Sequence, residues 1–256
     1  MNNLFQDLGW LQAAPSDFSL RLAGVNTGSA LRALAQYALG DNQLRKLAKK
    51  YSKLLSENAE LSGLTSMTIG VISNSTTQLI TPALQASALR FGIALNIVEA
   101  QYDQLAHEAY SAESAFAQCN VNMVLVAADY HGLPLKPCPG DREAAEKNVT
   151  ECLAYLQAVT QSLRVKTGAQ IILQNIAPPA ELLSGSFEGR LPGTTAWLLQ
   201  RLNSELDRLV ADDLFIFDVA GLASTVGLAN WHDPTLYNIG KLPFAQAFTP
   251  IYADYV

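Results

Sequence analysis

The stretch Thr65 to Gln78, TSMTIGVISNSTTQ, constrains the fold more than any other part of this chain. An apolar run with β-branched residues ends abruptly in five small polar residues, Ser73 to Thr77, and a helix-like apolar pattern follows from Leu79 to Phe91. This order predicts a strand, a tight polar turn and a helix. Ligands and nucleophiles lie at the carboxyl end of such a strand in an open α/β sheet. Ser75 is therefore predicted either to serve a site near the amino end of the next helix or simply to cap that helix.

From Thr65 onward, strand patterns alternate with helix patterns. Nearly continuous apolar runs predict buried strands at about residues 66–73, 93–99, 121–128, 169–176 and 213–219. Helical patterns cover about residues 77–91, 103–119, 141–167, 195–211 and 243–255. Strands separated by helices imply right-handed crossovers and a parallel sheet. The predicted fold class is therefore α/β, a three-layer, flavodoxin-like sandwich whose five parallel strands have the order 2-1-3-4-5.

Residues 1–62 are predicted to form a separate helical unit that lacks strands. Ser16 is the expected N-cap of a first helix, and a second runs from Ser29 to Gly40, where the glycine ends it. A third begins at Asp41 and places apolar residues on one face. We therefore expect two domains, a helical cap over residues 1–62 and an α/β domain over 63–256.

Composition excludes several classes of function. The 256 residues are 49% hydrophobic and carry a net charge of −6, which is unlike the basic footprint of a nucleic-acid-binding protein. No apolar run reaches the ~20 residues that span a bilayer, and the first residues do not resemble a signal peptide. Cys119, Cys138 and Cys152 are irregularly spaced, which argues against a disulfide framework and a zinc site. We expect a cytoplasmic protein without nucleic-acid or membrane partners. The basic run Arg45 to Lys53 is either the solvated face of a helix or a contact for an acidic partner.

Polar residues follow four of the five predicted strands, at the sheet edge where ligands bind. They are Asn74 and Ser75, then Asp129, Tyr130 and His131, then Gln174 and Asn175, and finally Asp218 with the later segment Asn230 to Asp233. Each also has a structural interpretation. Asp129 would cap a turn, His131 would be a solvated loop residue, and His232 would belong to the turn that Asp233-Pro234 forms.

Several segments resemble one known family. They read ISNSTTQLITPALQASALRFGIALNIVEAQYDQ, NVNMVLVAADYHGLPL and NWHDPTLYNIGKLPF, together with the opening LGWLQAAPSDFSLRL. Together these segments resemble the N-terminal domain of FkbH-like proteins, which is similar to the SGNH (GDSL-like) hydrolase fold, and the resemblance covers nearly the whole chain. Family members usually continue into a HAD-type phosphatase domain, and this chain stops at Tyr255-Val256, about where that domain would begin.

The resemblance implies a role in polyketide-type biosynthesis. Full-length members load a three-carbon glyceryl unit, derived from a bisphosphorylated glycerate, onto an acyl carrier protein. The implied partners are that carrier protein and a HAD-type phosphatase domain in cis or in trans. No cofactor is implied beyond the phosphopantetheine arm of the carrier, which would be bound as substrate.

The sequence departs from the SGNH pattern at two of its blocks. Ser75 stands in register with the serine of the Gly-Asp-Ser block. Asp129 takes the place of the asparagine that donates to the oxyanion, and an ionised carboxylate cannot donate. The last block, normally Asp-x-x-His, has Asp233 but no histidine three residues later, and His232 is the nearest substitute. We therefore expect little hydrolysis of simple esters and no phosphatase activity from this chain alone.

Two function classes remain, besides an ordinary SGNH esterase. In the first, the chain is an acyltransferase. Its catalytic residues would be Ser75 as nucleophile, His232 or His131 as base, and Asp233. Asn74, Asp129 and Asn175 would bind the substrate, and Asn175 or backbone N–H groups would stabilise the oxyanion. In the second, the chain is a catalytically silent domain that docks the acyl carrier protein.

Overall fold

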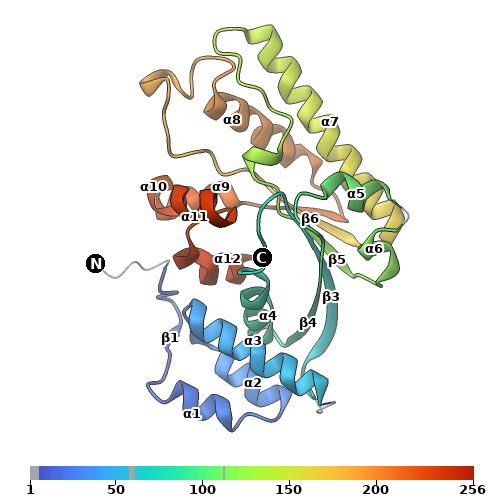
Figure 1. Ribbon diagram of the computed structural model, residues 1–256, viewed down its shortest axis with the longest axis vertical. Helices are drawn as coiled ribbons and strands as arrows, with labels where there is room; N and C mark the ends of the chain where they lie inside the picture. The colour runs from blue at the N-terminus through green and yellow to red at the C-terminus, as the bar shows by residue number, and fades with distance from the viewer. Residues whose placement is uncertain (1–5, 58–60, 112) are drawn as a thin grey trace. The chain divides into compact units, whose positions relative to one another are not determined.

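The computed structural model describes residues 6–57, 61–111 and 113–256 (Figure 1). The chain divides into two compact units. The first comprises residues up to 68 with 77–97 and 244–256, and the second comprises 69–76 with 98–243. The domain boundary expected at residue 62 stays a prediction. Residues 58–60 fall within the predicted helical unit and residue 112 within the helix predicted at 103–119, but these residues lie outside the described ones.

The main sheet has five strands, and it confirms the predicted α/β class. The strands are β3 (Thr65–Ile72), β4 (Ile93–Glu99), β5 (Met123–Val126), β6 (Gln170–Gln174) and β7 (Leu214–Phe217). Their order is β4-β3-β5-β6-β7, which is the predicted order 2-1-3-4-5. Val126 on β5 is in register with Ile72 on β3 and Leu173 on β6, and the pairing is parallel. The carboxyl ends of β3, β5, β6 and β7 therefore share one edge of the sheet.

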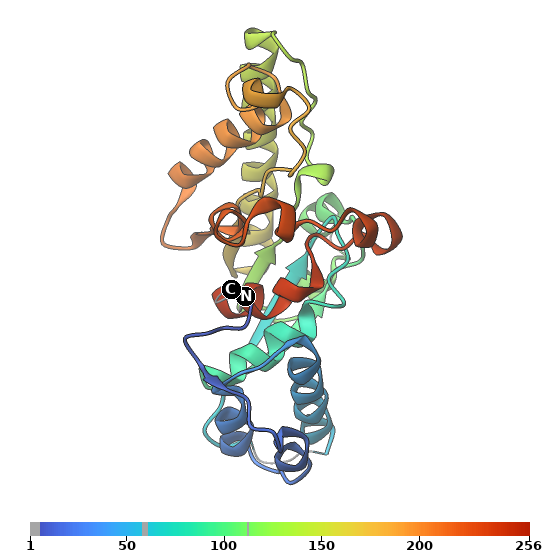
Figure 2. The ribbon, with the colours of Figure 1, turned by 90° about the vertical axis from the view of Figure 1, so that its left-hand side faces the viewer.

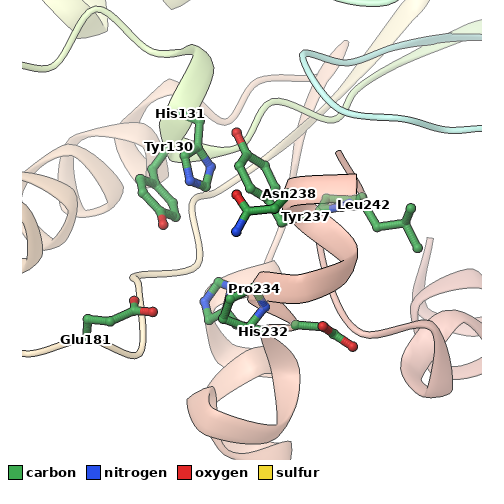
Figure 3. Close-up of a pocket in the computed structure, with 10 residues that line it drawn as sticks. Tyr130, His131, Glu181, His232, Pro234, Tyr237, Asn238 and Leu242 are labelled. Atoms are coloured by element: carbon green, nitrogen blue, oxygen red, sulfur yellow. The ribbon is translucent and has the colours of Figure 1, made fainter. Parts of the chain in front are cut away.

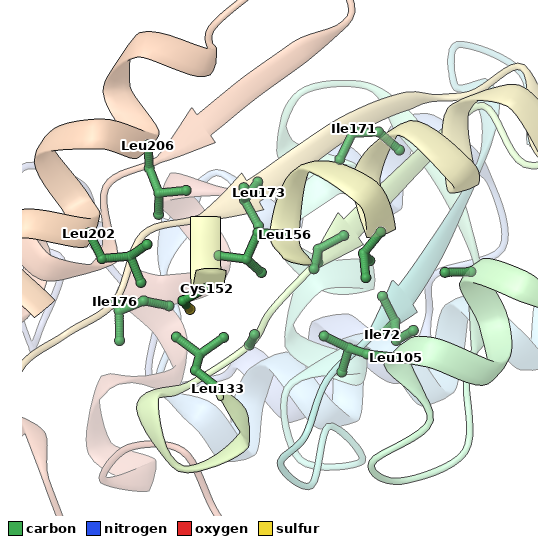
Figure 4. Packing of buried hydrophobic residues seen from close by; sticks show 14 of the residues in the cluster. Ile72, Leu105, Leu133, Cys152, Leu156, Ile171, Leu173, Ile176, Leu202 and Leu206 are labelled. Atoms are coloured by element: carbon green, nitrogen blue, oxygen red, sulfur yellow. The ribbon is translucent and has the colours of Figure 1, made fainter. Parts of the chain in front are cut away.

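The core of the second unit forms where helices meet β5 and β6. The helices of this unit are α5 (Leu105–Tyr110), α6 (Ala115–Gln118), α7 (Arg142–Thr167), α8 (Thr195–Leu206), α9 (Val219–Val226), α10 (Leu228–Trp231) and α11 (Pro234–Gly240). Helices α7 and α8 lie side by side (Figures 1 and 2). Leu156 of α7, Leu202 of α8 and Leu173 of β6 are fully buried in one apolar cluster (Figure 4). Burial of these apolar side chains stabilises the packing of the helices on the sheet, which holds the strand ends in place.

The first unit is mainly helical. It holds α1 (Phe18–Ala23), α2 (Gly28–Ala35), α3 (Asp41–Ser56), α4 (Thr81–Arg90) and α12 (Thr249–Tyr255). Helix α4 contacts α2, α3 and α12. Arg90 pairs with Asp254 in a partly buried ion pair, and burial lowers the pKa of Arg90. Tyr51 donates to the carbonyl of Leu95 across 3.2 Å, and burial raises its pKa to about 12.

The expectation that residues 1–62 lack strands is wrong. Two-residue strands, β1 (Gln12–Ala13) and β2 (Tyr37–Ala38), pair in parallel. Such short strands have no alternating pattern that a sequence could reveal, because their pairing depends on residues brought together by the helices around them. The second predicted helix therefore ends at Ala35 instead of Gly40. The first helix begins after Asp17, not after Ser16.

Several predicted helix boundaries also differ. The helix expected at 103–119 is split into α5 and α6, because the Ser111 and Ser114 side chains accept from backbone N–H groups that would continue a single helix. Helix α4 begins only at Thr81, with Pro82 in its first turn. Its N-cap is Ile80, so Ser75 does not cap it.

Candidate functional site

The turn after β3 is built by hydroxyl groups. The Ser73 hydroxyl donates to the carbonyl of Ala127 across 2.7 Å and accepts from the N–H of Ser75 across 2.9 Å. This arrangement ties the end of β3 to the end of β5 and turns the Ser75 backbone back toward the sheet. Ser73, Asn74 and Ser75 are all buried, with Ser75 only 2% exposed. The run of small polar residues after β3 is thus a compact buried turn.

Asp129, in the segment that follows β5, is the centre of the site. Its Oδ1 accepts from Asn74 Nδ2 across 2.7 Å and from the backbone N–H of His131 across 2.8 Å, and it lies 3.1 Å from His131 Nδ1. Its Oδ2 accepts a short hydrogen bond from the Ser75 hydroxyl. The backbone N–H of Asp129 donates to Asn74 Oδ1 across 2.7 Å. The sequence-predicted residues Asn74, Ser75, Asp129 and His131 therefore form one connected cluster.

The cluster keeps Asp129 ionised. Burial of this carboxyl opposes its ionisation, but hydrogen bonds from His131, Ser75 and Asn74 outweigh burial and hold the pKa of Asp129 below its ordinary value. An ionised carboxylate only accepts hydrogen bonds, so Asp129 cannot stabilise an oxyanion. A carboxyl of lowered pKa is also a weak base. The Ser75 hydroxyl therefore donates its hydrogen bond to the Asp129 carboxylate, which is poorly suited to remove the hydroxyl proton.

His131 is held on both faces by tyrosine rings. Its imidazole stacks on Tyr130, with ring centroids 3.8 Å apart, and on Tyr237 of α11, with centroids 4.0 Å apart. Burial, followed by nearby carboxylates, raises the pKa of Tyr130 to about 12. Burial and the Asp129 charge raise the pKa of Tyr237 to about 12. Both phenols therefore stay neutral at physiological pH, and they fix the plane of the imidazole.

A pocket of about 220 Å³ opens beside this stack (Figure 3). The residues that line it are Tyr130, His131, Glu181, His232, Asp233, Pro234, Tyr237, Asn238, Leu242 and Pro243. Figure 3 shows the His131 ring between the two tyrosines, with Glu181 below Tyr130 in this view. The lining combines imidazole, phenol, amide and carboxylate groups, which is the mixture that orients a small polar ligand.

His232 and Asp233 line this pocket, and the hydrogen bonds of both side chains are to the backbone. His232 Nε2 lies 2.8 Å from the carbonyl of Pro178, to which it donates, because a carbonyl only accepts. Asp233 Oδ1 accepts from the N–H of Leu236 and caps α11. The Asp233-Pro234 pair, expected to form a turn, starts a helix instead. The catalytic roles expected for His232 and Asp233 stay predictions.

Asn175 belongs to a second polar cluster, after β6 and β7. Its Nδ2 donates to Asp218 Oδ1 across 2.7 Å, and its Oδ1 accepts from the N–H of Ala220 across 2.8 Å. Asp218 also accepts from the N–H of Gly221 at the start of α9. These bonds occupy both ends of the Asn175 amide, and Asn175 does not line the pocket. The binding role expected for Asn175 stays a prediction, and the contacts seen are those of a capping network.

Tyr237, Asn238 and Glu181 line the pocket, but their sequence context gives little sign of a site. Tyr237 lies in the segment NWHDPTLYNIGK, in which the sequence predicts site roles for His232 and Asp233 only. Glu181 follows a proline pair in an irregular segment. Among the described residues, no cluster of three or more His, Cys, Asp and Glu side chains could hold a metal ion. No helix of the described chain is both long and apolar enough to cross a membrane.

Comparison with solved structures supports the fold. The N-terminal part of the protein BF1531 from Bacteroides fragilis, which contains a phosphatase domain and was crystallised with Mg, matches with a TM-score of 0.70 and 16% identity. The match covers 85% of this chain and 55% of the crystallised N-terminal part of BF1531, so the chain spans about half the length of that structure. A GDSL-like lipase from Bacteroides thetaiotaomicron has a TM-score of 0.42 and 12% identity, over 80% of this chain and 94% of the lipase.

The comparison with families is more specific. No curated protein matches the chain significantly. The family described as FkbH, N-terminal domain, matches residues 68–256, which is most of the chain and includes the whole cluster around Asp129. The resemblance that the sequence segments suggested is thereby confirmed, and the chain belongs to the FkbH N-terminal domain family.

Proposed function

We propose that this chain takes part in the transfer of a three-carbon glyceryl unit onto an acyl carrier protein in polyketide-type biosynthesis. In this proposal it binds and positions the reacting groups, and Ser75 is not a nucleophile. The phosphopantetheine arm of the carrier is the bound substrate, and phosphate removal belongs to a HAD-type phosphatase domain in cis or in trans. Membership of the FkbH N-terminal domain family supports the pathway. The crystallised part of BF1531 contains a phosphatase domain, and this chain covers 55% of that part, which supports the partner domain.

The hydrogen bond from Ser75 to Asp129 carries the proposal. A nucleophilic serine needs a base that takes its proton during attack. The Ser75 hydroxyl donates to the Asp129 carboxylate, whose pKa is lowered, and not to an imidazole. In SGNH hydrolases the position of Asp129 is taken by the residue that donates to the oxyanion. Ser75 is also 2% exposed. These features support a structural hydroxyl that anchors Asp129.

Ser75→Ala is expected to leave carrier loading within about threefold of wild type, because loss of a true nucleophile costs on the order of 10⁶-fold. The assay combines the chain, its HAD-type phosphatase partner, a bisphosphorylated glycerate and the acyl carrier protein. Intact mass of the carrier reports the added glyceryl unit. Ser224→Ala, on the exposed part of α9, is the matched control.

Two results would contradict the structural role of Ser75, and a third would contradict glyceryl transfer. One is loading by the wild-type protein that Ser75→Ala abolishes, which would assign Ser75 as nucleophile of an acyltransferase. The other is rapid turnover of a nitrophenyl ester that also depends on Ser75, which would restore the esterase interpretation. Absence of loading by the wild-type mixture would refute the glyceryl-transfer role itself.

Docking of the carrier is expected to use α3. Within its basic run, Arg45 pairs with Asp41 and Lys53 lies 3.6 Å from Glu57, whereas Lys46 and Lys49 are exposed. Carrier proteins are typically acidic, and charges at the rim of an interface mainly set association rates.

Lys46→Glu with Lys49→Glu should weaken carrier binding roughly tenfold at low salt, and less at high salt. Surface plasmon resonance measures this effect, with Lys147→Glu on α7 as control. Equal binding by the double variant would remove α3 from the docking surface.

A further inference from the structure

The Asp129 carboxylate determines which nitrogen of His131 can react. His131 Nδ1 lies 3.1 Å from Asp129 Oδ1, and the backbone N–H of His131 donates to the same oxygen. Because the ionised carboxylate only accepts, Nδ1 must carry the hydrogen. The neutral imidazole then has its lone pair on Nε2. Asp129 thus holds His131 in the tautomer that a general base needs.

The carboxylate also separates His131 from Ser75. Ser75 binds Oδ2, and both His131 contacts are to Oδ1. The Ser75 hydroxyl is therefore directed to Asp129 and not to the imidazole. The proton that His131 could accept must come from another group, and His131 lines the pocket.

The pocket fits a small external reactant. Its volume of about 220 Å³ lies below the ~300–1,000 Å³ of drug-sized sites. The Tyr130 and Tyr237 rings prevent the imidazole from tilting. His232, the other imidazole of the lining, already uses Nε2 on the carbonyl of Pro178. His131 is therefore the better placed of the two to accept a proton through Nε2.

We propose that His131, oriented by Asp129, is the general base that activates an external thiol in this pocket. The proposal deepens the proposed function, on which its choice of a thiol rests. The thiol proton passes to His131 Nε2 as the sulfur attacks the carbonyl carbon of an acyl phosphate. The C–S bond forms, the C–O bond to the acyl phosphate group breaks, and that phosphate leaves, while the other phosphate of the bisphosphorylated glycerate remains for the HAD-type phosphatase domain. The protonated imidazole then returns its proton to phosphate or to water. Asp129 is a positioning residue in this step.

The kinetic test compares His131→Gln with wild type in the carrier-loading assay. Loss of a general base is expected to lower kcat by ~10²–10⁴-fold, with the KM for the carrier nearly unchanged. His107→Gln, which changes an exposed residue of α5, is the matched control. If His131→Gln keeps kcat within threefold of wild type, as His107→Gln should, the proposal is wrong.

A second measurement does not depend on carrier loading. The chain has three histidines, so ring nitrogen NMR signals can be assigned with His107→Gln, His131→Gln and His232→Gln. Neutral His131 is expected as the Nδ1–H tautomer, and pantetheine with acetyl phosphate should shift its Nε2 signal. Asp129→Ala should move the population toward Nε2–H while the other histidine signals keep their positions, which a purely structural role of Asp129 would not do.

The two measurements separate failure of this inference from failure of the proposed function. If the wild-type mixture does not load the carrier but pantetheine still shifts His131 Nε2, the glyceryl role fails and the thiol site stands. If neutral His131 is the Nε2–H tautomer, or if pantetheine shifts no His131 signal, the base assignment is overturned whatever the loading assay gives.

Discussion

Replacing Asp129 with alanine is expected to lower the free energy of unfolding by about 3 kcal/mol, a large share of the ~5–15 kcal/mol typical of a domain. The change removes the acceptor of Ser75 Oγ, Asn74 Nδ2 and His131 Nδ1, and of the His131 backbone N–H. Ser75 and Asn74 are buried, so water cannot readily replace the lost acceptor. Urea unfolding at pH 7, followed by circular dichroism, measures the loss. Because Asp129 orients His131, the same variant should also lose carrier loading by ~10²-fold or more.

Asp129→Asn is the matched control, and pH tests the role of the charge. An asparagine can keep an oxygen at the Oδ1 position, and the Ser75 hydroxyl can rotate to accept from its amide, so a loss of only about 1 kcal/mol in the free energy of unfolding is expected.

The lowered pKa of Asp129 in the folded state means that its charge stabilises the fold at pH values above the pKa of about 3.9 that an aspartate has in the unfolded chain. That contribution is lost as pH falls through the folded pKa. The wild-type advantage over Asp129→Asn should therefore be constant between roughly pH 5 and 7 and shrink below pH 4. An advantage that grows in acid would contradict the assignment.

Gly132→Ala is expected to damage the same site by steric overlap. A Cβ on Gly132 would lie 2.4 Å from Cβ and from Cγ of Asn74. Asn74 is buried and bonded to Asp129 through both ends of its amide, so it cannot move aside without breaking those bonds. Overpacking of this kind costs about 1–3 kcal/mol. We expect a lower urea midpoint and a displaced His131 NMR signal in this variant.

Gly189→Ala provides the comparison for Gly132. Its added Cβ would lie 3.2 Å from Nε2 of Gln200, the mobile end of an exposed side chain that can move away. The stability of Gly189→Ala should stay within about 0.5 kcal/mol of wild type. Equal effects of the two substitutions would show that the contact between Gly132 and Asn74 does not limit the site.

The sheet could be predicted because its strands are long apolar runs with clear ends. The run at 93–99 coincides with β4, and the long helix predicted at 141–167 is α7, which Asp141 caps and Gly168 ends in the left-handed conformation. Local signals of this kind do not depend on the rest of the fold. The pairing of β1 with β2 leaves no such signal, because each strand has only two residues.

The candidate site could be predicted in its residue types but not in its bonds. Strand ends identified Ser75, Asp129 and His131, because parallel strands bring their carboxyl ends to one edge. Which carboxylate oxygen each residue binds depends on how the buried turn after β3 is folded, and no spacing encodes this. Tyr237 was missed because α11 is short and its sequence shows no periodicity that would point a ring at His131.

The two rings that enclose His131 come from distant parts of the chain, and α11 is fastened to the turn after β3 where Thr76 meets Gly240 and Lys241. Chains fold progressively from the N-terminus as they are made. The residues of β3 and β5 and Asp129 are therefore synthesised well before Tyr237. A chain that does not yet have α11 has only the Tyr130 ring to place beside His131, so the pocket lining is complete only once α11 is present.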